Sequence, residues 1–292
     1  MNIPTSFSTS CLSLIVCLLA FTSCDLIPPT VPPTTEAGVL WNLKYGPKDR
    51  NRLDISLPAD RDAATPVIIL IHGGAWIIGD KLSMTQARER LANEGFAVVA
   101  MNYSYVSQPQ TDYLDLMAEI DSVVSFLADS ASVWTFDPEN IGLAGISAGA
   151  HMSLLYAYGY DPDERVKAVG SIVGPVDLTD DFYHSGTFAQ QEFLVYGGLV
   201  QLVDTSFAAY PAAYEDASPI FRLKDVPTQL FYGRTDHLVN YQQAFRMDSV
   251  LTEEGIDHEF HFFEDAGHNL VNMYPDSVYS ELTSWFTSYL MN

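Results

Sequence analysis

The sequence predicts an α/β fold in which helices cover both faces of a mostly parallel central sheet. Two observations support this prediction. Short apolar stretches with the pattern of strands alternate along the chain with stretches that have the pattern of helices, as parallel sheets require. In addition, residues 67–71 form one continuous, largely β-branched run, which is typical of a strand that is buried on both faces.

The expected elements follow one another along residues 52–290. Residues 52–57 alternate apolar and polar side chains and stop at Pro58, as in a half-buried strand. A helix is expected at about residues 82–93, because a helix-compatible stretch ends there before Gly95. Further strands are expected at residues 96–100, 141–144, 166–173, 228–232 and 260–263. Apolar side chains that recur on one face predict further helices at residues 114–127 and 278–290.

Residues 38–292 are predicted to form a single domain. The chain has 292 residues, of which 48% are hydrophobic, and neither a repeat nor a second linker interrupts this part. All three cysteines lie within the first 24 residues, so no disulfide can join parts of the domain. The formal net charge is -23 and no Lys or Arg cluster is found, which argues against nucleic acid as a partner.

The first 37 residues predict an export signal and a tether. Residues 1–23 are expected to be a signal peptide, because their uncharged apolar run is too short to span a membrane. The small residues before Cys24 resemble the lipobox of bacterial lipoproteins, which implies that Cys24 is lipidated after cleavage. Residues 24–37 contain four prolines and are expected to form an extended tether. An ordinary cleaved signal or a buried apolar segment is the alternative.

Ser147 is the candidate nucleophile. It is the third residue of Gly-Ile-Ser-Ala-Gly at 145–149, between an expected strand and a helix-compatible stretch. In a nucleophile elbow the flanking residues must be small, because the chain folds back on itself there. The serine hydroxyl and the N–H group of Ala148 would then lie at the positive end of a helix, where an oxyanion is stabilised. A plain turn is the alternative, and the flanking strand and helix favour the elbow.

A second loop, at residues 72–76, reads His-Gly-Gly-Ala-Trp and follows the buried strand at 67–71. Consecutive glycines at a strand end can present backbone N–H groups without obstruction by side chains, as an oxyanion hole requires. We therefore expect Gly73, Gly74 and Ala148 to form this hole. With the two motifs in this order, the chain resembles the α/β-hydrolase superfamily and, within it, the esterase and lipase branch related to hormone-sensitive lipase.

The resemblance implies that an acid and a base follow the serine in the chain. Asp236 lies in a Gly-x-x-Asp loop after an expected strand, and His268 lies in a Gly-His loop after the next one; both loops are similar to those of the family. His268 would accept the proton of Ser147, and Asp236 would fix the tautomer of the imidazole. Glu264 and Asp265 are closer to His268 in sequence, but on one tight loop either would have to fold back to reach its ring.

The substrate pocket is expected to involve Trp76, Tyr103 and the cap, a name used here for residues 177–219. An insertion at this place covers the site in the family, and the aromatic side chains of this one would line an apolar pocket with polar tips. Tyr103 follows a strand where the family has a structural or substrate-lining tyrosine. The alternative for the aromatic side chains is that they only pack the cap onto the sheet.

Other polar residues are expected to have no part in the chemistry. His258 and His261 would point to opposite faces of a strand, so no metal site is expected there. His151 follows Ser147 by one helical turn and is expected to be a buried packing residue. The acidic run at residues 177–181 is expected to be a solvated turn, and contact with the substrate is the alternative.

These motifs predict a serine carboxylic ester hydrolase that works through an acyl-enzyme and needs neither a metal nor an organic cofactor. Its substrate would be a small ester or an acylated carbohydrate. Two alternatives stay open. One is an amide hydrolase of the same fold, either formamidase-like or a short relative of the prolyl peptidases. The other is a non-catalytic binding protein on this scaffold. The protein is expected to be exported and lipid-anchored to a bacterial membrane, on its periplasmic or cell-surface side.

Overall fold

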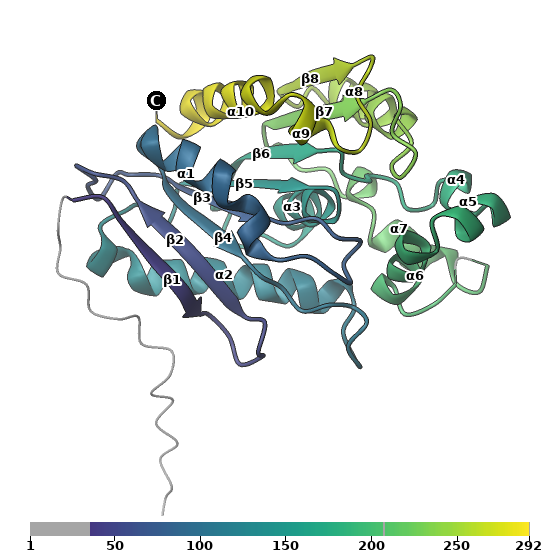
Figure 1. Cartoon of the computed structure of the whole chain (residues 1–292), viewed down its shortest axis with the longest axis horizontal. Coiled ribbons are helices and arrows are strands. Elements are labelled where there is room, and N and C mark those ends of the chain that lie inside the picture. Colours follow the sequence, from purple (N-terminus) through teal and green to yellow (C-terminus); the bar gives the residue numbers. More distant parts are fainter. Residues whose placement is uncertain (1–35, 207, 292) are drawn as a thin grey trace, which may run out of the picture.

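A computed structural model describes residues 36–206 and 208–291, in which helices cover both faces of an eight-stranded sheet (Figure 1). The strands lie in the order β1-β2-β4-β3-β5-β6-β7-β8. β2 is antiparallel to both of its neighbours, whereas all pairs from β4 to β8 are parallel. The predicted α/β fold with a mostly parallel sheet is confirmed.

The strands and helices have the following bounds. The strands are β1 Gly38–Lys44, β2 Arg52–Leu57, β3 Val67–Ile71, β4 Ala97–Met101, β5 Ile141–Ile146, β6 Val166–Ile172, β7 Thr228–Gly233 and β8 His258–Phe263. The long helices are α1 Thr85–Asn93, α2 Tyr113–Trp134, α3 Ala148–Gly159, α6 Phe193–Leu202, α8 Gln242–Glu254 and α10 Pro275–Leu290. The short helices are η1 Lys81–Met84, α4 Asp181–His184, α5 Gly186–Gln191, α7 Pro211–Asp216, η2 Pro219–Phe221 and α9 Leu270–Met273.

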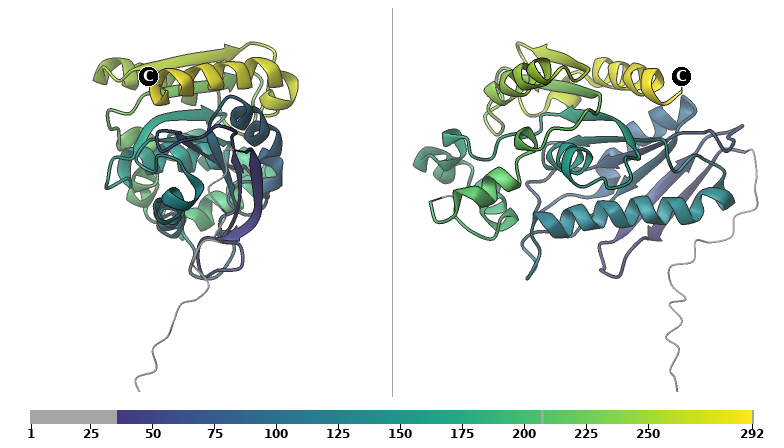
Figure 2. Two further views of the ribbon diagram at one scale, coloured as in Figure 1. Left: turned by 90° about the vertical axis from the view of Figure 1, so that its left-hand side faces the viewer. Right: turned by 180° about the vertical axis from the view of Figure 1, so that it is seen from behind.

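The two faces of the sheet have separate hydrophobic cores. On one face, α1 and α10 contribute fully buried side chains such as Leu91 and Phe286. On the other face, α2, α3 and α8 contribute side chains such as Leu127, Leu155 and Leu251. Seen from behind, the long helix α2 crosses in front of the sheet (Figure 2, right). Sheet residues are therefore buried from both sides, as the continuous apolar run of β3 predicts.

β1, α8 and the helices of the cap lie outside the sequence-based expectations. β1 is an edge strand whose residues are all partly or fully exposed, so it lacks the alternation that marks a half-buried strand. α8 was not expected either, although its residues contact both β7 and β8. The strands with predicted bounds, and likewise α1 and α10, begin and end within a few residues of those bounds, whereas α2 continues to Trp134. A helix was expected after Ser147 without stated bounds, and α3 occupies that place.

The parallel strands point their carboxyl ends toward one edge of the sheet. The loops after β3, β5, β7 and β8 therefore meet there, and these are the loops in which the candidate site residues lie. The cap follows β6, and its helices α4 to α7 form a separate group beyond this end of the sheet (Figure 1).

The N-terminal predictions concern residues that are mostly not described. The expected signal peptide at 1–23 and Cys24 lie outside the described residues, as does all of the tether at 24–37 except its last two residues. Within the described ranges, no helix combines the length and the apolar character that are needed to cross a membrane.

Candidate active site

Ser147 lies at a tight turn between β5 and α3, with backbone φ 57° and ψ -119°. Two glycines make this turn possible. A Cβ atom on Gly145 would lie 2.2 Å from the carbonyl carbon of Gly149. A Cβ atom on Gly149 would lie 2.1 Å from the carbonyl oxygen of Ile71 in β3. Because neither contact is sterically possible, the turn and its packing on β3 require glycine at both positions.

The structure brings Ser147, His268 and Asp236 together in one hydrogen-bonded chain. His268 Nε2 lies 2.9 Å from Ser147 Oγ, and His268 Nδ1 lies 2.8 Å from Asp236 Oδ2. The Asp236 side chain is fully buried, and its second oxygen accepts hydrogen bonds from the N–H groups of Leu238 and Val239. A carboxylate fixed in this way holds the imidazole with Nδ1 protonated, which leaves Nε2 free to accept the serine proton.

The two acidic residues nearest to His268 in sequence have other partners. Asp265 accepts a hydrogen bond of 2.7 Å from the hydroxyl of Tyr274. Glu264 forms an ion pair with Arg234 on the protein surface. The geometry therefore places Asp236, and neither of these residues, next to the imidazole.

The expected oxyanion loop lies directly against the elbow. A Cβ atom on Gly73 would lie 2.9 Å from the carbonyl oxygen of Ile146 and 3.2 Å from Ser147 Cβ. Gly74 has a φ of 125°, and a Cβ atom there would lie 2.1 Å from the carbonyl oxygen of Ile78. Ala148 is the first residue of α3, so its N–H group has no acceptor within the helix. The backbone of both segments can thus approach a substrate bound at Ser147.

Tyr103 supports this loop from beneath, and the expectation that it lines the pocket is wrong. Its side chain is 0% exposed, and its ring stacks on that of His72 with the centroids 4.3 Å apart. The Tyr103 hydroxyl donates to the carbonyl oxygen of His72 at 3.1 Å. Met101 at the end of β4 pairs with Ile71, so Tyr103, two residues later, lies beside the start of the loop and is buried there.

His72 is a supporting residue that the sequence analysis did not single out. Burial lowers the pKa of His72 to about 4, so its imidazole is neutral. Nδ1 then donates to the carbonyl oxygen of Gly73 at 2.7 Å, and Nε2 faces the guanidinium of Arg50 at 3.5 Å. Arg50 also donates to the carbonyl oxygens of Tyr103 and Gly79. This group of side chains fixes the backbone of residues 72–74.

A cavity of about 420 Å³ opens above Ser147, between the sheet edge and the cap. Trp76 lines it and Tyr103 does not. Most of its lining is apolar. The side chains with hydrogen-bonding groups are those of Trp76, Ser147, Tyr183, Glu192 and His268. The other lining residues are Gly73, Gly74, Ala75, Ile78, Ile146, Ala148, Pro175, Leu178, Leu194, Val195, Leu199, Leu238 and Val239.

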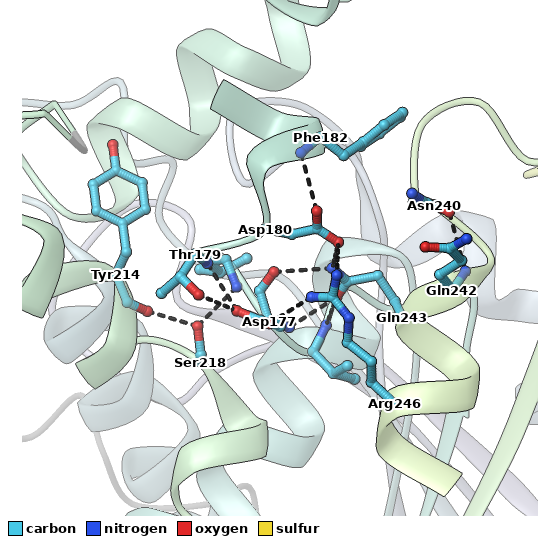
Figure 3. A network of polar contacts seen from close by, with 12 residues as sticks. Asp177, Thr179, Asp180, Phe182, Tyr214, Ser218, Asn240, Gln242, Gln243 and Arg246 are labelled. Carbon is cyan, nitrogen blue, oxygen red and sulfur yellow. Dashed lines mark hydrogen bonds and ion pairs between the residues drawn. The ribbon is translucent and has the colours of Figure 1, made fainter. Parts of the chain in front are cut away.

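Asp177 and Asp180 of the acidic run at residues 177–181 anchor the cap, so the expectation of a solvated turn is wrong for these two residues, while Asp181 is exposed. Asp177 and Asp180 are each only 7% exposed. Arg246 of α8 bridges them, with N···O distances of 2.8 Å and 3.2 Å (Figure 3). The fully buried Gln243 donates to the carbonyl oxygen of Asp177 and to the carboxylate of Asp180. Because α8 was not foreseen, the sequence offered no partner for these carboxylates.

The remaining histidines have structural contacts. His151 is fully buried, as expected; its Nε2 donates to the carbonyl oxygen of Ala217 at 2.7 Å, and burial lowers its pKa to about 4. His258 lies beside Asp248 of α8, whereas His261 stacks on Phe231.

His261 also belongs to a group that the sequence analysis missed. Glu259, His261 and Glu281 each offer one side-chain nitrogen or carboxylate oxygen of the kind that can bind a metal ion, and these three atoms lie within 4.8 Å of one another. The side-chain amide of the buried Gln229 donates to Glu259 and lies 3.1 Å from His261 Nε2. Glu281 comes from α10, so no local sequence pattern could have indicated this group.

Curated proteins that are similar to this chain include esterases. The chain is 26% identical over 250 residues to the isoprenylcysteine alpha-carbonyl methylesterase ICME of Arabidopsis thaliana, over 78% of this chain and 56% of the relative. It is 31% identical over 221 residues to the probable carboxylic ester hydrolase LipM of Mycobacterium tuberculosis, over 70% of this chain and 49% of the relative. The chain thus spans about half the length of these relatives.

Solved structures share the fold. A truncated form of a carbohydrate esterase from gut microbiota has a TM-score of 0.72 at 20% identity, over 90% of this chain and 100% of that one. Esterase B from Lactobacillus rhamnosis has a TM-score of 0.69 at 20% identity, over 89% of each chain. The α/β-hydrolase fold that the resemblance implies is confirmed. The closer relation to hormone-sensitive lipase stays a prediction.

The family assignment rests on a match to a family model. The BD-FAE family matches residues 53–251, which is more than half of the 292 residues of the chain. This range runs from β2 into α8 and includes Ser147, Asp236 and the cap, while His268 lies beyond it. The chain therefore belongs to the BD-FAE family.

Proposed function

We propose that this protein is a serine carboxylic ester hydrolase that forms an acyl-enzyme on Ser147. The observation that carries the proposal is the hydrogen-bonded chain from Ser147 through His268 to Asp236 beside an apolar cavity. The names of the curated relatives support ester substrates in particular. A small ester fits a cavity of about 420 Å³.

In the first half of the reaction, Ser147 Oγ attacks the ester carbonyl carbon while His268 Nε2 accepts its proton. The carbonyl oxygen becomes an oxyanion and accepts hydrogen bonds from backbone N–H groups of Gly73, Gly74 and Ala148. Asp236 stabilises the imidazolium that forms. The tetrahedral intermediate then releases the alcohol, which takes the proton from His268, and the acyl group stays on Ser147.

In the second half, water takes the place of the alcohol. His268 accepts a proton from the water as its oxygen attacks the acyl carbon. Collapse of the second tetrahedral intermediate breaks the bond to Ser147 Oγ, which recovers its proton from His268, and the carboxylic acid is released. Each proton that leaves a nucleophile is thus returned to a leaving group.

The test combines active-site labelling with a substrate panel. A fluorophosphonate probe should label the wild type and leave Ser147→Ala unlabelled, and the variant should melt like the wild type while turnover falls by about 10⁵-fold. Labelling of the variant would overturn the assignment of the nucleophile. The panel contains p-nitrophenyl esters of increasing chain length, acylated sugars, an aryl formamide and a prolyl amide.

The panel also separates the alternatives. Faster turnover of the formamide or the prolyl amide than of every ester would replace the proposal by an amide hydrolase. Absence of both labelling and turnover would indicate a binding protein on this scaffold. Preference for acylated sugars would specify the proposal as a carbohydrate deacylase.

We further propose that the protein is exported and anchored to a bacterial membrane through a lipid on Cys24. The supporting observation is in the sequence alone, namely the apolar run and the small residues before Cys24. Mass spectrometry of the mature protein should find a lipidated N-terminal Cys24, and Cys24→Ala should keep the esterase activity and lose the anchor. An unmodified N-terminus beyond Cys24 would contradict the anchor without affecting the active-site proposal.

A further inference from the structure

Three side chains that can bind a metal ion meet between the edge strand β8 and the helix α10. Glu259 and His261 belong to β8 and Glu281 belongs to α10, and one ligand atom of each lies within 4.8 Å of the other two. None of the three lines the cavity above Ser147. The chemistry proposed above therefore gives this group no role.

The strand register brings the members of the group to one face of the sheet. Gln229 of β7 pairs with Glu259, and Phe231 pairs with His261, so these four side chains point to the same side. Phe231 belongs to the hydrophobic core that α10 covers, and Glu281 lies on that helix. The imidazole of His261 stacks on Phe231 with the ring centroids 4.7 Å apart, which fixes its orientation.

The side-chain amide of Gln229 is fully buried and is aimed into the group. Gln229 is 0% exposed, and its Oε1 atom has no hydrogen-bond partner among the described residues. Its Nε2 atom donates to Glu259 Oε2 at 2.9 Å and to the carbonyl oxygen of Glu281 at 3.3 Å, and it lies 3.1 Å from His261 Nε2. Buried amides rarely leave their oxygen unpaired, and carboxylates that bind a metal are commonly held by a hydrogen bond of this kind. The placement of Gln229 therefore indicates a ligand in the group.

His261 Nε2 faces a donor and an acceptor at the same time. The amide nitrogen of Gln229 lies at 3.1 Å, and Glu259 Oε2 lies at 3.3 Å. Without a proton, Nε2 accepts from the amide and repels the carboxylate; with a proton, it donates to the carboxylate and opposes the amide N–H. A cation that binds Nε2 and the carboxylate oxygen together removes this conflict. The two N–H bonds of the amide then go to Glu259 and to the carbonyl oxygen of Glu281.

The two carboxylates of the group have no Lys or Arg partner. Within residues 36–206 and 208–291, the ion pair of Glu259 is with His261, and none of the ion pairs involves Glu281. Both carboxylates are exposed, so a cation can reach them from solution. The formal net charge of -23 favours its approach.

The donor set selects the kind of cation. Imidazole nitrogen together with carboxylate oxygen is typical of Zn²⁺, whereas Ca²⁺ and Mg²⁺ take oxygen ligands. Ligand atoms at about 2.1 Å from a tetrahedral zinc ion lie about 3.4 Å apart, which agrees with the 3.3 Å between His261 Nε2 and Glu259 Oε2. Rotation of the exposed Glu281 side chain can bring its carboxylate to the same separation. Water would complete the coordination.

We propose that Glu259, His261 and Glu281 bind one Zn²⁺ ion that fastens the edge strand β8 to α10. Gln229 orients the carboxylate of Glu259 and does not bind the ion itself. The site is structural and adds no step to the chemistry at Ser147. The inference is independent of the proposed esterase function.

The experiment titrates the full chain with ZnCl₂ in an isothermal calorimeter. Cys11, Cys17 and Cys24 are changed to serine in every sample, because free thiolates also bind zinc. This cysteine-free parent should bind one zinc ion per chain. At a zinc concentration of about one hundred times Kd, its melting temperature should rise by about 5 °C.

Three variants test the residues of the site. Glu281→Gln is the decisive one, because Glu281 is exposed and its replacement leaves the packing intact. It should weaken zinc binding by more than about tenfold. His261→Phe keeps a ring on Phe231 and removes the ligand nitrogen, so it should have at least the same effect. Gln229→Met should weaken binding by about 10- to 100-fold, as is usual when a residue that orients a metal ligand is replaced.

Matched control variants change the same kinds of side chain outside the group. His258 also lies on β8 but is paired with Asp248, and Glu253 is exposed near the end of α8. His258→Gln and Glu253→Gln should therefore keep the zinc affinity of the parent. An equal loss in these controls would overturn the assignment of the site.

Four other outcomes would overturn the proposal. The first is a parent that binds no zinc, and the second is a Glu281→Gln variant that binds zinc as tightly as the parent. The third is a larger rise in melting temperature with Ca²⁺ than with Zn²⁺, which would indicate a site of oxygen ligands alone. The fourth is slower turnover of a p-nitrophenyl ester by Glu281→Gln well below its melting temperature, which would contradict a purely structural role. Labelling at Ser147 tests the esterase proposal separately, so either proposal can fail without the other.

Discussion

The edge of the sheet that carries the proposed catalytic residues Ser147, Asp236 and His268, here called the catalytic edge, and the cap above it are held in place by different kinds of contact. At the edge, backbone packs on backbone: Gly73, Gly145 and Gly149 each leave no room for a Cβ atom, because carbonyl groups of neighbouring segments lie within 3 Å. At the base of the cap, side chains make the connection through Asp177, Asp180 and α8 (Figure 3). We therefore expect substitutions at the edge to change the rate of the chemical steps. Substitutions in the cap should instead change which substrate is bound and how tightly.

After Ser147 itself, the largest effect is expected at Asp236, the proposed acid of the catalytic edge. Asp236→Asn should lower kcat by about 10⁴-fold, because an amide would favour the wrong tautomer of His268. Asp265→Asn is the matched control, since Asp265 bonds to Tyr274 and does not contact His268. Steady-state kinetics on one p-nitrophenyl ester measures both. Losses of equal size would show that Asp236 is not the acid.

Two glycines, one at the catalytic edge and one in the cap, test whether the backbone is packed more tightly at the edge than in the cap. Gly149→Ala should lower the free energy of unfolding by about 3 kcal/mol, because its Cβ atom would lie 2.1 Å from the carbonyl oxygen of Ile71. Gly197→Ala in α6 of the cap should raise it by up to about 1 kcal/mol, because the nearest atom would lie at 3.9 Å and alanine favours a helix. Urea denaturation followed by circular dichroism would measure both. Equal stability of the two variants would contradict the difference in packing.

Acid pH should destabilise both regions through two buried histidines. Burial lowers the pKa of His72 at the catalytic edge and of His151 at the junction with the cap to about 4. Between pH 6.5 and 4 the unfolded chain binds protons that the folded chain does not, so stability falls as pH falls. The loss approaches about 3 kcal/mol for each histidine at pH 4.

Denaturation between pH 7 and pH 4.5 checks this expectation. His151→Gln keeps a donor for the carbonyl oxygen of Ala217 and removes one titrating group. Its stability should therefore depend less steeply on pH over this interval than that of the wild type. If the stability of His151→Gln depends on pH as steeply as that of the wild type, burial does not lower the pKa of His151.

The smallest effect is expected for the ion pair at the base of the cap. Arg246→Gln should lower the free energy of unfolding by about 1 kcal/mol, since Arg246 is 41% exposed although Asp177 and Asp180 are buried. KM should rise more than kcat falls, because the cap positions the substrate. Arg222→Gln is the control, as Arg222 pairs with the exposed Asp216 and should change stability by less than about 0.5 kcal/mol. A loss of kcat without a change in KM would contradict the division between chemistry and binding.

The sequence by itself determined the sheet core and the order of the site residues. Backbone geometry restricts which residues can form a buried strand or a tight turn. The apolar run of β3, the small residues around Ser147 and the loops at strand ends can therefore be recognised from the local sequence. Since parallel strands end at one edge, these loops had to meet, and the structure brings Ser147, Asp236 and His268 within hydrogen-bond distance.

Only the tertiary structure decided which polar side chains face the substrate and which support the fold. Tyr103, Asp177 and Asp180 are buried against partners far away in sequence. Tyr103 stacks on His72, and both carboxylates pair with Arg246. Tyr183 and Glu192 of the cap line the cavity although both are far from Ser147 in sequence. Such contacts depend on how separate segments pack, and this has no signature in the local sequence pattern.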